Sequence, residues 1–327
     1  MSEHEIIRIS ENERINTREL NIIQSRSLDE NPAAVYLAQL NSESGRRSQT
    51  QALGVIAAMF GQDAFSLDWS KLRYQHTAAI RSRLMEVYKP ATVNKFLSAI
   101  RGTLKQAWIL GQMTAEEYQR ATQLKSVIND TLPAGRDLSR GEIRALLNDC
   151  MKDDSNIGVR DGAIIALLAA GGLRRQELVT IELDDYNPET GRLFINGKRQ
   201  KDRYIYLDNG AADAMEDWIH VRGDQPGALF LAINKSGAIQ YGNNMAAQSI
   251  YDMLKKRAES SKIKNFSPHD LRRTLAGDLL DEGVDIVTVS KILGHSSVTT
   301  TGRYDRRGEE VKKKAAGTIH IPYRKRF

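Results

Sequence analysis

An uninterrupted series of helical patterns between Asn31 and Val127 constrains the fold more than any other feature of this chain, because no strand-like alternation breaks it. Apolar residues recur at helical spacing over residues 32–40, 48–60, 72–88, 91–110 and 115–127. Residues typical of helix ends separate these ranges, namely Asn31, Gly45, Gly61, Pro90 and Thr114. The pattern predicts a compact bundle of four or five helices.

The segment 129–137 (NDTLPAGRD) marks a boundary, since it holds Pro133 and Gly135 and has no apolar face of its own. A chain of 327 residues, 41% of them hydrophobic, can supply a core on each side of it. The predicted organisation is a loosely ordered arm over residues 1–28, a helical domain over 29–130, a linker over 131–137, a second domain over 138–307 and a tail over 308–327.

The second domain is predicted to be helical with one small sheet. Ser139 and Glu142 form the pattern of a capping box, and an apolar helix over 161–170 ends at Gly172, which delivers Arg174 from a helix end in the core. Residues 191–207 alternate as a β-hairpin with a basic tip. Further helices are predicted over 211–221, 244–260, 269–282, 286–293 and 299–307. The fold class is therefore mainly α with a small antiparallel β-sheet, in two domains.

The composition of this chain favours some classes of partner and excludes some kinds of site. The net charge of +6 favours a polyanion, and nucleic acid is the polyanion that we predict. Cys150 is the only cysteine, so neither a disulfide framework nor a zinc-thiolate cluster can form. No run of 18 apolar residues occurs, and the amino terminus is too charged for a signal peptide. We therefore expect a cytoplasmic protein without a membrane partner.

Basic side chains are the candidates for contact with DNA phosphates. In the helical domain they are Arg46, Arg47, Arg81, Arg83, Lys95, Arg101 and Lys105. In the second domain they are Lys201, Arg203 and Arg273.

Three residues suit an attack on a DNA phosphodiester. Displacement at phosphorus builds negative charge on the non-bridging oxygens, which fixed cations must meet when no metal does so. Guanidinium groups do this well because they stay charged and offer a planar fork, and Arg174 and Arg272 are the candidates. His269 lies three residues before Arg272, hence on the same helix face. Taken alone, this histidine and arginine also fit a solvated surface.

Two further side chains have supporting roles in this hypothesis. Glu177 lies three residues after Arg174 and can hold it in place, although an ordinary surface ion pair has the same spacing. Lys198 follows the Asn196-Gly197 turn of the predicted hairpin, where an ammonium could protonate a departing 5′ oxygen. Lys201 and Arg203 compete for that role, and each of these cations also fits a solvated hairpin tip.

A histidine and a tyrosine nine residues apart complete the candidate site. His295 follows Gly294, which lets the backbone turn sharply and brings the imidazole close to a phosphate; a capping or core histidine is the alternative. Tyr304 is the candidate nucleophile, because nearby cations would stabilise its phenolate. Those cations are Arg303, Arg306 and Arg307. Other tyrosines are interpreted as packing residues, namely Tyr186, Tyr204, Tyr206, Tyr241 and Tyr251.

The motifs GLRRQEL, INGKRQKDRYIYL, SPHDLRR and LGHSSVTTTGRY, in this order, resemble the tyrosine recombinase (phage integrase) family, its Xer and integrase branches most. The resemblance covers residues 137–307, and residues 31–127 are similar to the family's core-binding domain in character. It implies catalytic roles for Arg174, Lys198, His269, Arg272, His295 and Tyr304, with Glu177 as the acidic helper. Arg273 stands where many relatives have a second histidine.

By this resemblance, the two domains clamp double-stranded DNA at inverted-repeat core sites. Tyr304 attacks the scissile phosphate, which gives a 3′-phosphotyrosine and a free 5′-hydroxyl without ATP, metal or cofactor. Four protomers pair two sites and exchange strands through a Holliday junction. Accessory factors are among the further partners. The reaction serves integration or excision of a mobile element, or a related recombination. Bound to DNA, the protein would associate with the nucleoid. The tail, with its apolar residues near Ile319 and Tyr323, is expected to dock on a neighbouring protomer.

Two other functions remain open from the sequence. A type IB topoisomerase shares the cations and the tyrosine but relaxes supercoils without pairing two sites. A non-catalytic DNA-binding regulator would need no tyrosine nine residues after LGH, so the complete residue set argues against it.

Overall fold

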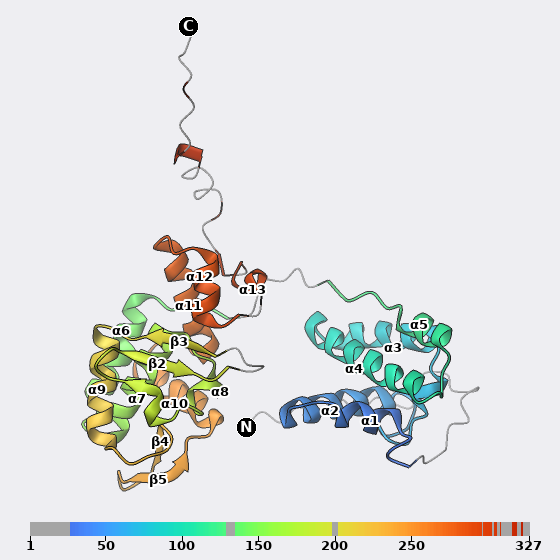
Figure 1. The fold of residues 1–327 in the computed structure, drawn as a ribbon, viewed down its shortest axis with the longest axis horizontal. Helices are drawn as coiled ribbons and strands as arrows, with labels where there is room; N and C mark the ends of the chain where they lie inside the picture. Colours follow the sequence, from blue (N-terminus) through green and yellow to red (C-terminus); the bar gives the residue numbers. More distant parts are fainter. Residues whose placement is uncertain are drawn as a thin grey trace. The chain divides into compact units, whose positions relative to one another are not determined.

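The computed structural model describes residues 27–128, 135–197, 202–295, 297–302, 304–305, 308, 316–318 and 322. The chain divides into two compact units, Met1–Thr131 and Leu132–Phe327 (Figure 1). The described residues are mainly helical with small antiparallel sheets, which confirms the predicted fold class. The predicted arm up to residue 26, most of the linker and most of the tail lie outside the described residues.

The first unit is built around one long central helix. Its α-helices are α1 (Pro32–Ala38), α2 (Glu43–Ala58), α3 (Tyr74–Val87), α4 (Pro90–Ile109) and α5 (Ala115–Thr122), with a 3₁₀ helix η2 (Trp69–Lys71). Helix α4 packs against all of these elements. Its buried Leu97 and Ile100 join Leu53, Ile56 and Trp69 in the core. Burial of this apolar face stabilises the bundle more than helix propensity does.

Two helix boundaries in this unit differ from the sequence prediction by five residues. Helix α2 begins at Glu43 because the Ser42 hydroxyl accepts the Gly45 N–H at 3.1 Å, so Gly45 lies inside the first turn. Helix α5 ends at Thr122, five residues before the predicted end. Asn94 of α4 instead donates to the Val127 carbonyl and accepts its N–H, both at 2.8 Å, which satisfies this backbone without a helix.

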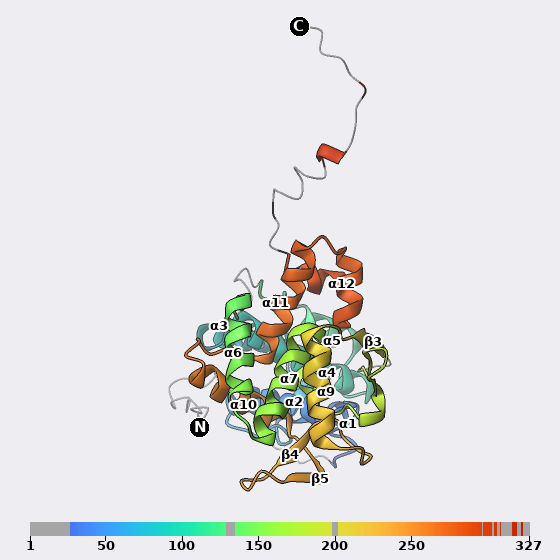
Figure 2. The ribbon, with the colours of Figure 1, turned by 90° about the vertical axis from the view of Figure 1, so that its left-hand side faces the viewer.

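The second unit is centred on a buried helix. Its α-helices are α6 (Arg140–Met151), α7 (Asn156–Gly171), α8 (Arg175–Leu178), α9 (Gly210–Arg222), α10 (Ala247–Ser260), α11 (Pro268–Asp281), α12 (Ile286–Leu293) and α13 (Val298–Gly302). Helix α7 lies between α6 and α9 and also packs against α11 (Figure 2). Its Ile164, Leu167 and Leu168 are fully buried. A helix that is enclosed by its neighbours in this way is apolar on nearly all sides.

The prediction of a single small sheet was wrong, because the described residues form two. The expected hairpin is β2 (Arg192–Ile195) with β3 (Arg203–Tyr206), paired Leu193 to Ile205 and extended by β1 (Tyr186–Asn187). A second antiparallel pair, β4 (Leu231–Ile233) and β5 (Ile239–Asn244), was not predicted. Strand β4 is very short and β5 (IQYGNN) has no regular apolar alternation, so neither gives a strand pattern.

The ends of several helices meet in the second unit, and this is where the candidate residues lie. Gly172 ends α7 in the left-handed conformation, with φ 57° and ψ 35°. A Cβ on Gly172 would lie 2.6 Å from a side-chain carbon of Leu293, so α12 can approach the end of α7 only because this residue is glycine.

No helix among the described residues is long and apolar enough to cross a bilayer.

Candidate active site

Arg174 lies between α7 and α8 and is held from two sides. Its backbone N–H and its Nη1 donate to the Glu177 carboxylate at 2.9 and 2.6 Å, and its Nη2 donates to the Gly294 carbonyl at 2.8 Å. The helix end that precedes it is buried, as predicted, but the Arg174 side chain itself is 44% exposed. The short helix α8 positions the side chain while its guanidinium keeps access to solvent.

Glu177 is buried and serves two arginines. Its carboxylate accepts Nη1 and Nη2 of Arg203 at 3.2 and 2.8 Å, in addition to the bonds from Arg174. Burial alone would raise the pKa of Glu177, but the hydrogen bonds and charges of Arg203 and Arg174 outweigh it and lower the pKa to about 2. Glu177 is therefore an anion at any physiological pH.

Arg203 has its guanidinium inside the protein. Its side chain is 8% exposed, and Nε donates to the Ile292 carbonyl at 2.8 Å. The sequence suggested Arg203 as a DNA contact or a proton donor, but this arginine instead ties β3 to α8 and to the end of α12. We assign it a positioning role, because its donors are directed at protein acceptors.

Glu177→Gln should lower the free energy of unfolding by about 3 kcal/mol at neutral pH, since it removes the anion between two arginines. The folded-state pKa lies below the ordinary 4.5, so this stabilisation is present above pH 4.5 and is lost as the pH falls toward 2. Urea unfolding of both proteins at neutral pH and near pH 3 measures the difference. Glu116→Gln, in an exposed ion pair with Arg120, is the control and should change little. An equal loss at both pH values would contradict the prediction.

Arg272 projects from α11 and is 2% exposed. Its Nη1 donates to the Gly172 carbonyl at 2.6 Å and its Nη2 to the Leu293 carbonyl at 2.5 Å. Burial and the positive charge of Arg174 lower the pKa of Arg272 to about 9, so the group is still a cation at neutral pH. This arginine therefore joins the ends of α7 and α12 and carries a charge that little water screens.

His269 and Tyr304 form a hydrogen-bonded pair. The Tyr304 hydroxyl lies 3.2 Å from His269 Nε2, and Tyr304 is 6% exposed, packed in the cluster of Ala276, Leu280, Val289 and Leu293. Burial and the Arg272 charge lower the pKa of His269 below 6.5, so its imidazole is neutral at neutral pH. A neutral imidazole can accept the phenol proton.

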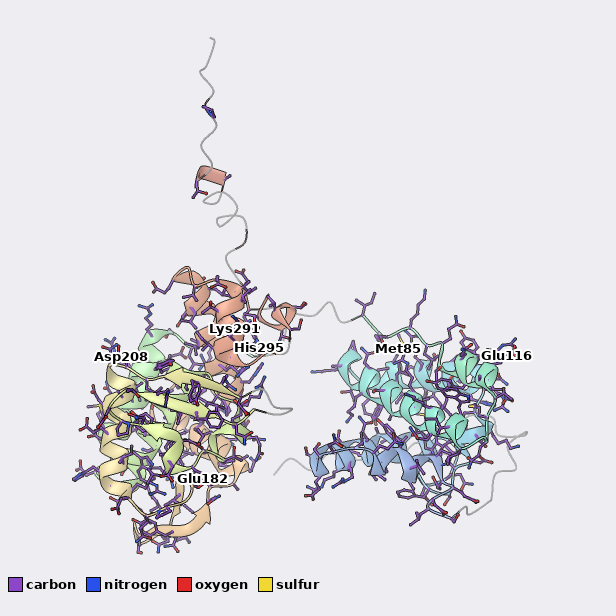
Figure 3. All side chains as sticks on the ribbon, viewed as in Figure 1. Met85, Glu116, Glu182, Asp208, Lys291 and His295 are labelled. Atoms are coloured by element: carbon purple, nitrogen blue, oxygen red, sulfur yellow. The ribbon has the colours of Figure 1, made fainter. Side chains whose placement is uncertain are left out.

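His295 lies just beyond the end of α12, near Lys291 (Figure 3). Its ring centroid is 5.9 Å from that of Tyr304. Burial, with the charges of Arg272 and Arg174, lowers the pKa of His295 to about 4. This imidazole is therefore neutral as well.

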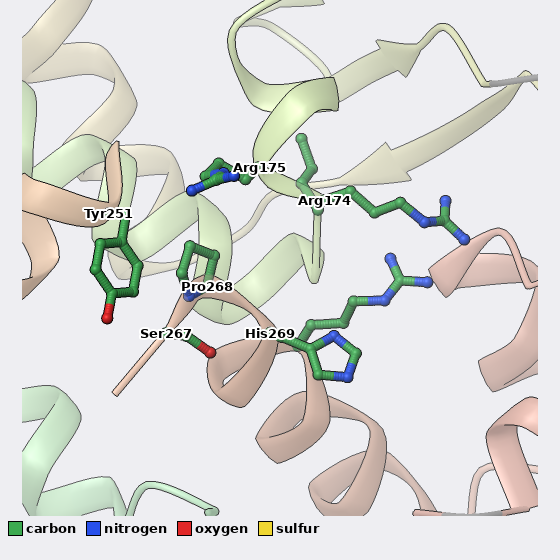
Figure 4. Close-up of a pocket in the computed structure, with 8 residues that line it drawn as sticks. Arg174, Arg175, Tyr251, Ser267, Pro268 and His269 are labelled. Carbon is green, nitrogen blue, oxygen red and sulfur yellow. The ribbon is translucent and has the colours of Figure 1, made fainter. Parts of the chain in front are cut away.

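A cavity of about 250 Å³ opens beside these residues (Figure 4). It is lined by Leu173, Arg174, Arg175, Tyr251, Ser267, Pro268, His269 and Arg272. In Figure 4, Arg174 and His269 extend to the right-hand side and Tyr251 lies at the left. The sequence predicts that Tyr251 is a packing residue, but its side chain is 39% exposed. Only the polar face of α10 in the sequence could have indicated this exposure.

The arrangement combines cations for a phosphate with a tyrosine next to a base. Arg174, His269, Arg272, His295 and Tyr304 are linked through the contacts described above, with Glu177 beneath Arg174. Within the described ranges, no group of three or more His, Cys, Asp or Glu side chains is placed to hold a metal ion. The groups present can stabilise negative charge on phosphate oxygens and move one proton from the tyrosine.

The remaining predicted residues of the second unit fall outside the described residues or make other contacts. Lys198 and Lys201 lie outside the described residues, as do Arg303, Arg306 and Arg307. Arg273 is paired with Asp137 at 3.2 Å, with its side chain 17% exposed. The pair connects the end of the linker to α11.

The basic candidates of the first unit lie on α2, α3 and α4. Arg46, Arg47 and Lys105 are exposed, and Arg83 and Lys95 are partly exposed. Arg81 and Arg101 are also partly exposed, and they donate to the carbonyls of Lys125 and Leu124. These two arginines thus also hold the backbone that follows α5.

Known proteins resemble this chain over both units. The Phage integrase family model matches residues 136–310. The tyrosine recombinase XerD of Pseudomonas aeruginosa is 31% identical over 229 residues, which are 68% of this chain and 73% of that protein. The tyrosine recombinase XerC of Pelobacter propionicus is 26% identical over 89% of this chain and 90% of its own. The fold is similar to the Tn1549 transposon integrase, solved in complex with a circular intermediate DNA, with TM-score 0.67, 18% identity and coverage of 88% and 99%.

Proposed function

Because the chain belongs to the phage integrase family and is a tyrosine-type site-specific DNA recombinase, we propose that Tyr304 is its nucleophile and that the cluster around Tyr304 is its active site. The observation that carries this proposal is the 3.2 Å contact between the Tyr304 hydroxyl and Nε2 of a neutral His269. A phenol is a weak nucleophile until a base takes its proton. In the described part of the second unit, Tyr304 is the tyrosine that has this contact beside two arginines.

In the proposed first step, the Tyr304 oxygen attacks the scissile phosphorus while His269 Nε2 accepts the phenol proton. Arg174 and Arg272 bind the non-bridging oxygens, whose negative charge grows as the bond forms. The bond from phosphorus to the 5′ oxygen breaks, and the 5′-hydroxyl leaves with a proton that we assign to Lys198. A 3′-phosphotyrosine remains.

In the proposed second step, a 5′-hydroxyl of the partner DNA attacks this phosphotyrosine, so the ester energy is kept and no ATP is needed. We propose that four protomers pair two inverted-repeat sites and that the strands are exchanged through a Holliday junction. The two predicted domains, 29–130 and 138–307, would both bind the duplex, with the basic residues of α2, α3 and α4 on its phosphates. We also propose that accessory factors take part and that the tail over residues 308–327 docks on a neighbouring protomer.

The biological role that we propose is integration or excision of a mobile element, or a related recombination. The relatives XerC and XerD, named as tyrosine recombinases, support the recombination chemistry that these roles share. Since the substrate is DNA, the protein would act at the nucleoid.

Covalent trapping tests the proposed function. The protein is incubated with DNA that flanks its own gene, the reaction is stopped with SDS, and the attached peptide and DNA end are identified by mass spectrometry and sequencing. The expected result is one adduct at Tyr304 on a 3′ phosphate within an inverted repeat. Attachment through another residue would overturn the assignment of Tyr304. Adducts scattered along any DNA, with relaxation of supercoils, would indicate a topoisomerase.

Cleavage should depend on pH through His269. Because its pKa is lowered below 6.5, the base stays neutral as the pH falls to 6.5, and the rate should decline only below that value. The measurement is kcat/KM for cleavage on both sides of pH 6.5, since this ratio reports the free enzyme. His269→Gln should be slow throughout and lose this acid limb. A midpoint above 6.5 in the unchanged protein would contradict the assignment of His269 as the base.

A further inference from the structure

Thr301 contacts both His295 and Tyr304. Its Oγ1 lies 2.8 Å from His295 Nδ1, and its carbonyl accepts the Tyr304 N–H at 2.9 Å. Thr301 is fully buried, so its hydroxyl meets protein rather than water. Its neighbour Thr299 in the same short helix is exposed. Of these two threonines, Thr301 is the one placed to act on the active site.

The contact with Nδ1 decides which nitrogen of His295 carries the proton. A neutral imidazole has one N–H, and a partner that donates to Nδ1 leaves the proton on Nε2. A threonine hydroxyl can donate or accept, so the distance alone allows both tautomers. The chemistry of the site separates them. Phosphate oxygens only accept hydrogen bonds, and an unprotonated Nε2 facing them would repel the substrate.

We propose that the Thr301 hydroxyl donates to His295 Nδ1 and thereby holds His295 as the Nε2–H tautomer, ready to donate to a non-bridging oxygen of the scissile phosphate. This inference rests on the proposed function of the cluster. Thr301 is a positioning residue in this mechanism, because it acts through His295 and does not touch DNA. Its carbonyl also restrains the backbone of Tyr304, so one buried residue sets the geometry of an oxyanion donor and of the nucleophile.

The tautomer can be measured directly. In protein labelled with ¹⁵N at histidine, long-range proton–nitrogen correlation should show His295 as the Nε2–H form in the unchanged chain. Thr301→Val keeps the shape but removes the hydroxyl, and it should give mixed tautomers and slow DNA cleavage by about 10- to 100-fold. Thr301→Ser restores a hydroxyl and should recover most of the rate. Thr299→Val is the matched control and should leave both the spectrum and the rate unchanged.

An Nδ1–H form of His295 in the unchanged chain would overturn the inference, as would Thr301→Val cleaving at the full rate. If Thr301→Val does not fold, the spectrum of the unchanged chain and the rate of Thr301→Ser still decide. Failure of the proposed function looks different, since Tyr304→Phe would then still form a covalent adduct.

Discussion

Tyr304→Phe should abolish covalent attachment to DNA and reduce strand cleavage by on the order of 10⁴-fold or more. The substitution removes the attacking oxygen, because phenylalanine has no hydroxyl group. The phenyl ring can remain packed among Ala276, Leu280, Val289 and Leu293. The lost hydrogen bond to His269 should change the free energy of unfolding by about 1 kcal/mol or less.

The assay is adduct formation on a nicked substrate that traps the cleaved state, with DNA binding measured in parallel. Binding should be nearly unchanged, which separates lost chemistry from lost folding. Tyr206→Phe is the control, since Tyr206 is an exposed tyrosine of β3. An adduct formed by Tyr304→Phe at the normal rate would refute the assignment of the nucleophile.

Arg272→Lys should slow cleavage by about 10²- to 10³-fold although it keeps a positive charge. The guanidinium of Arg272 reaches the carbonyls of Gly172 and Leu293 together, and a single ammonium cannot reproduce this fork. One carbonyl is then left without its donor, which should lower the free energy of unfolding by about 1–3 kcal/mol.

Single-turnover cleavage at saturating DNA measures the effect, at a temperature where thermal unfolding shows both proteins to be folded. Arg144→Lys, at an exposed arginine of α6, is the matched control and should behave as the unchanged protein. Full activity of Arg272→Lys would mean that charge alone matters at this position and that the fork does not.

The sequence could predict the elements of this molecule because its helices carry clear caps and apolar faces. Ser139 with Glu142 predicted the start of α6, and Gly172 predicted the end of α7. The short pair β4 and β5 lacks such a pattern and was missed. The spacing of His269 and Arg272 likewise placed both on α11, where one helix turn brings them to the same cavity.

The burial and the partners of several site residues depend on tertiary contacts, which the sequence pattern does not predict. Arg203 and Glu177 are 26 residues apart, and their bidentate pair forms only when β3 packs beside α8. A basic residue near a hairpin tip therefore looked like a DNA contact although its guanidinium is buried. The exposure of Arg174 and the burial of Tyr304 likewise depend on how the helix ends pack. A local sequence pattern does not predict that packing.

The sharing of Glu177 between Arg174 and Arg203 fixes the electrical balance of the site. Three guanidinium groups, those of Arg174, Arg203 and Arg272, face one carboxylate, so two positive charges remain while both histidines are neutral. A resting phosphodiester brings one negative charge, and the attacking phenolate brings a second as the bond forms. Because His269 keeps the phenol proton, the total charge of site and substrate stays at +1, while the second negative charge develops on the phosphate oxygens next to Arg174 and Arg272. This growing attraction favours the transition state over the ground state.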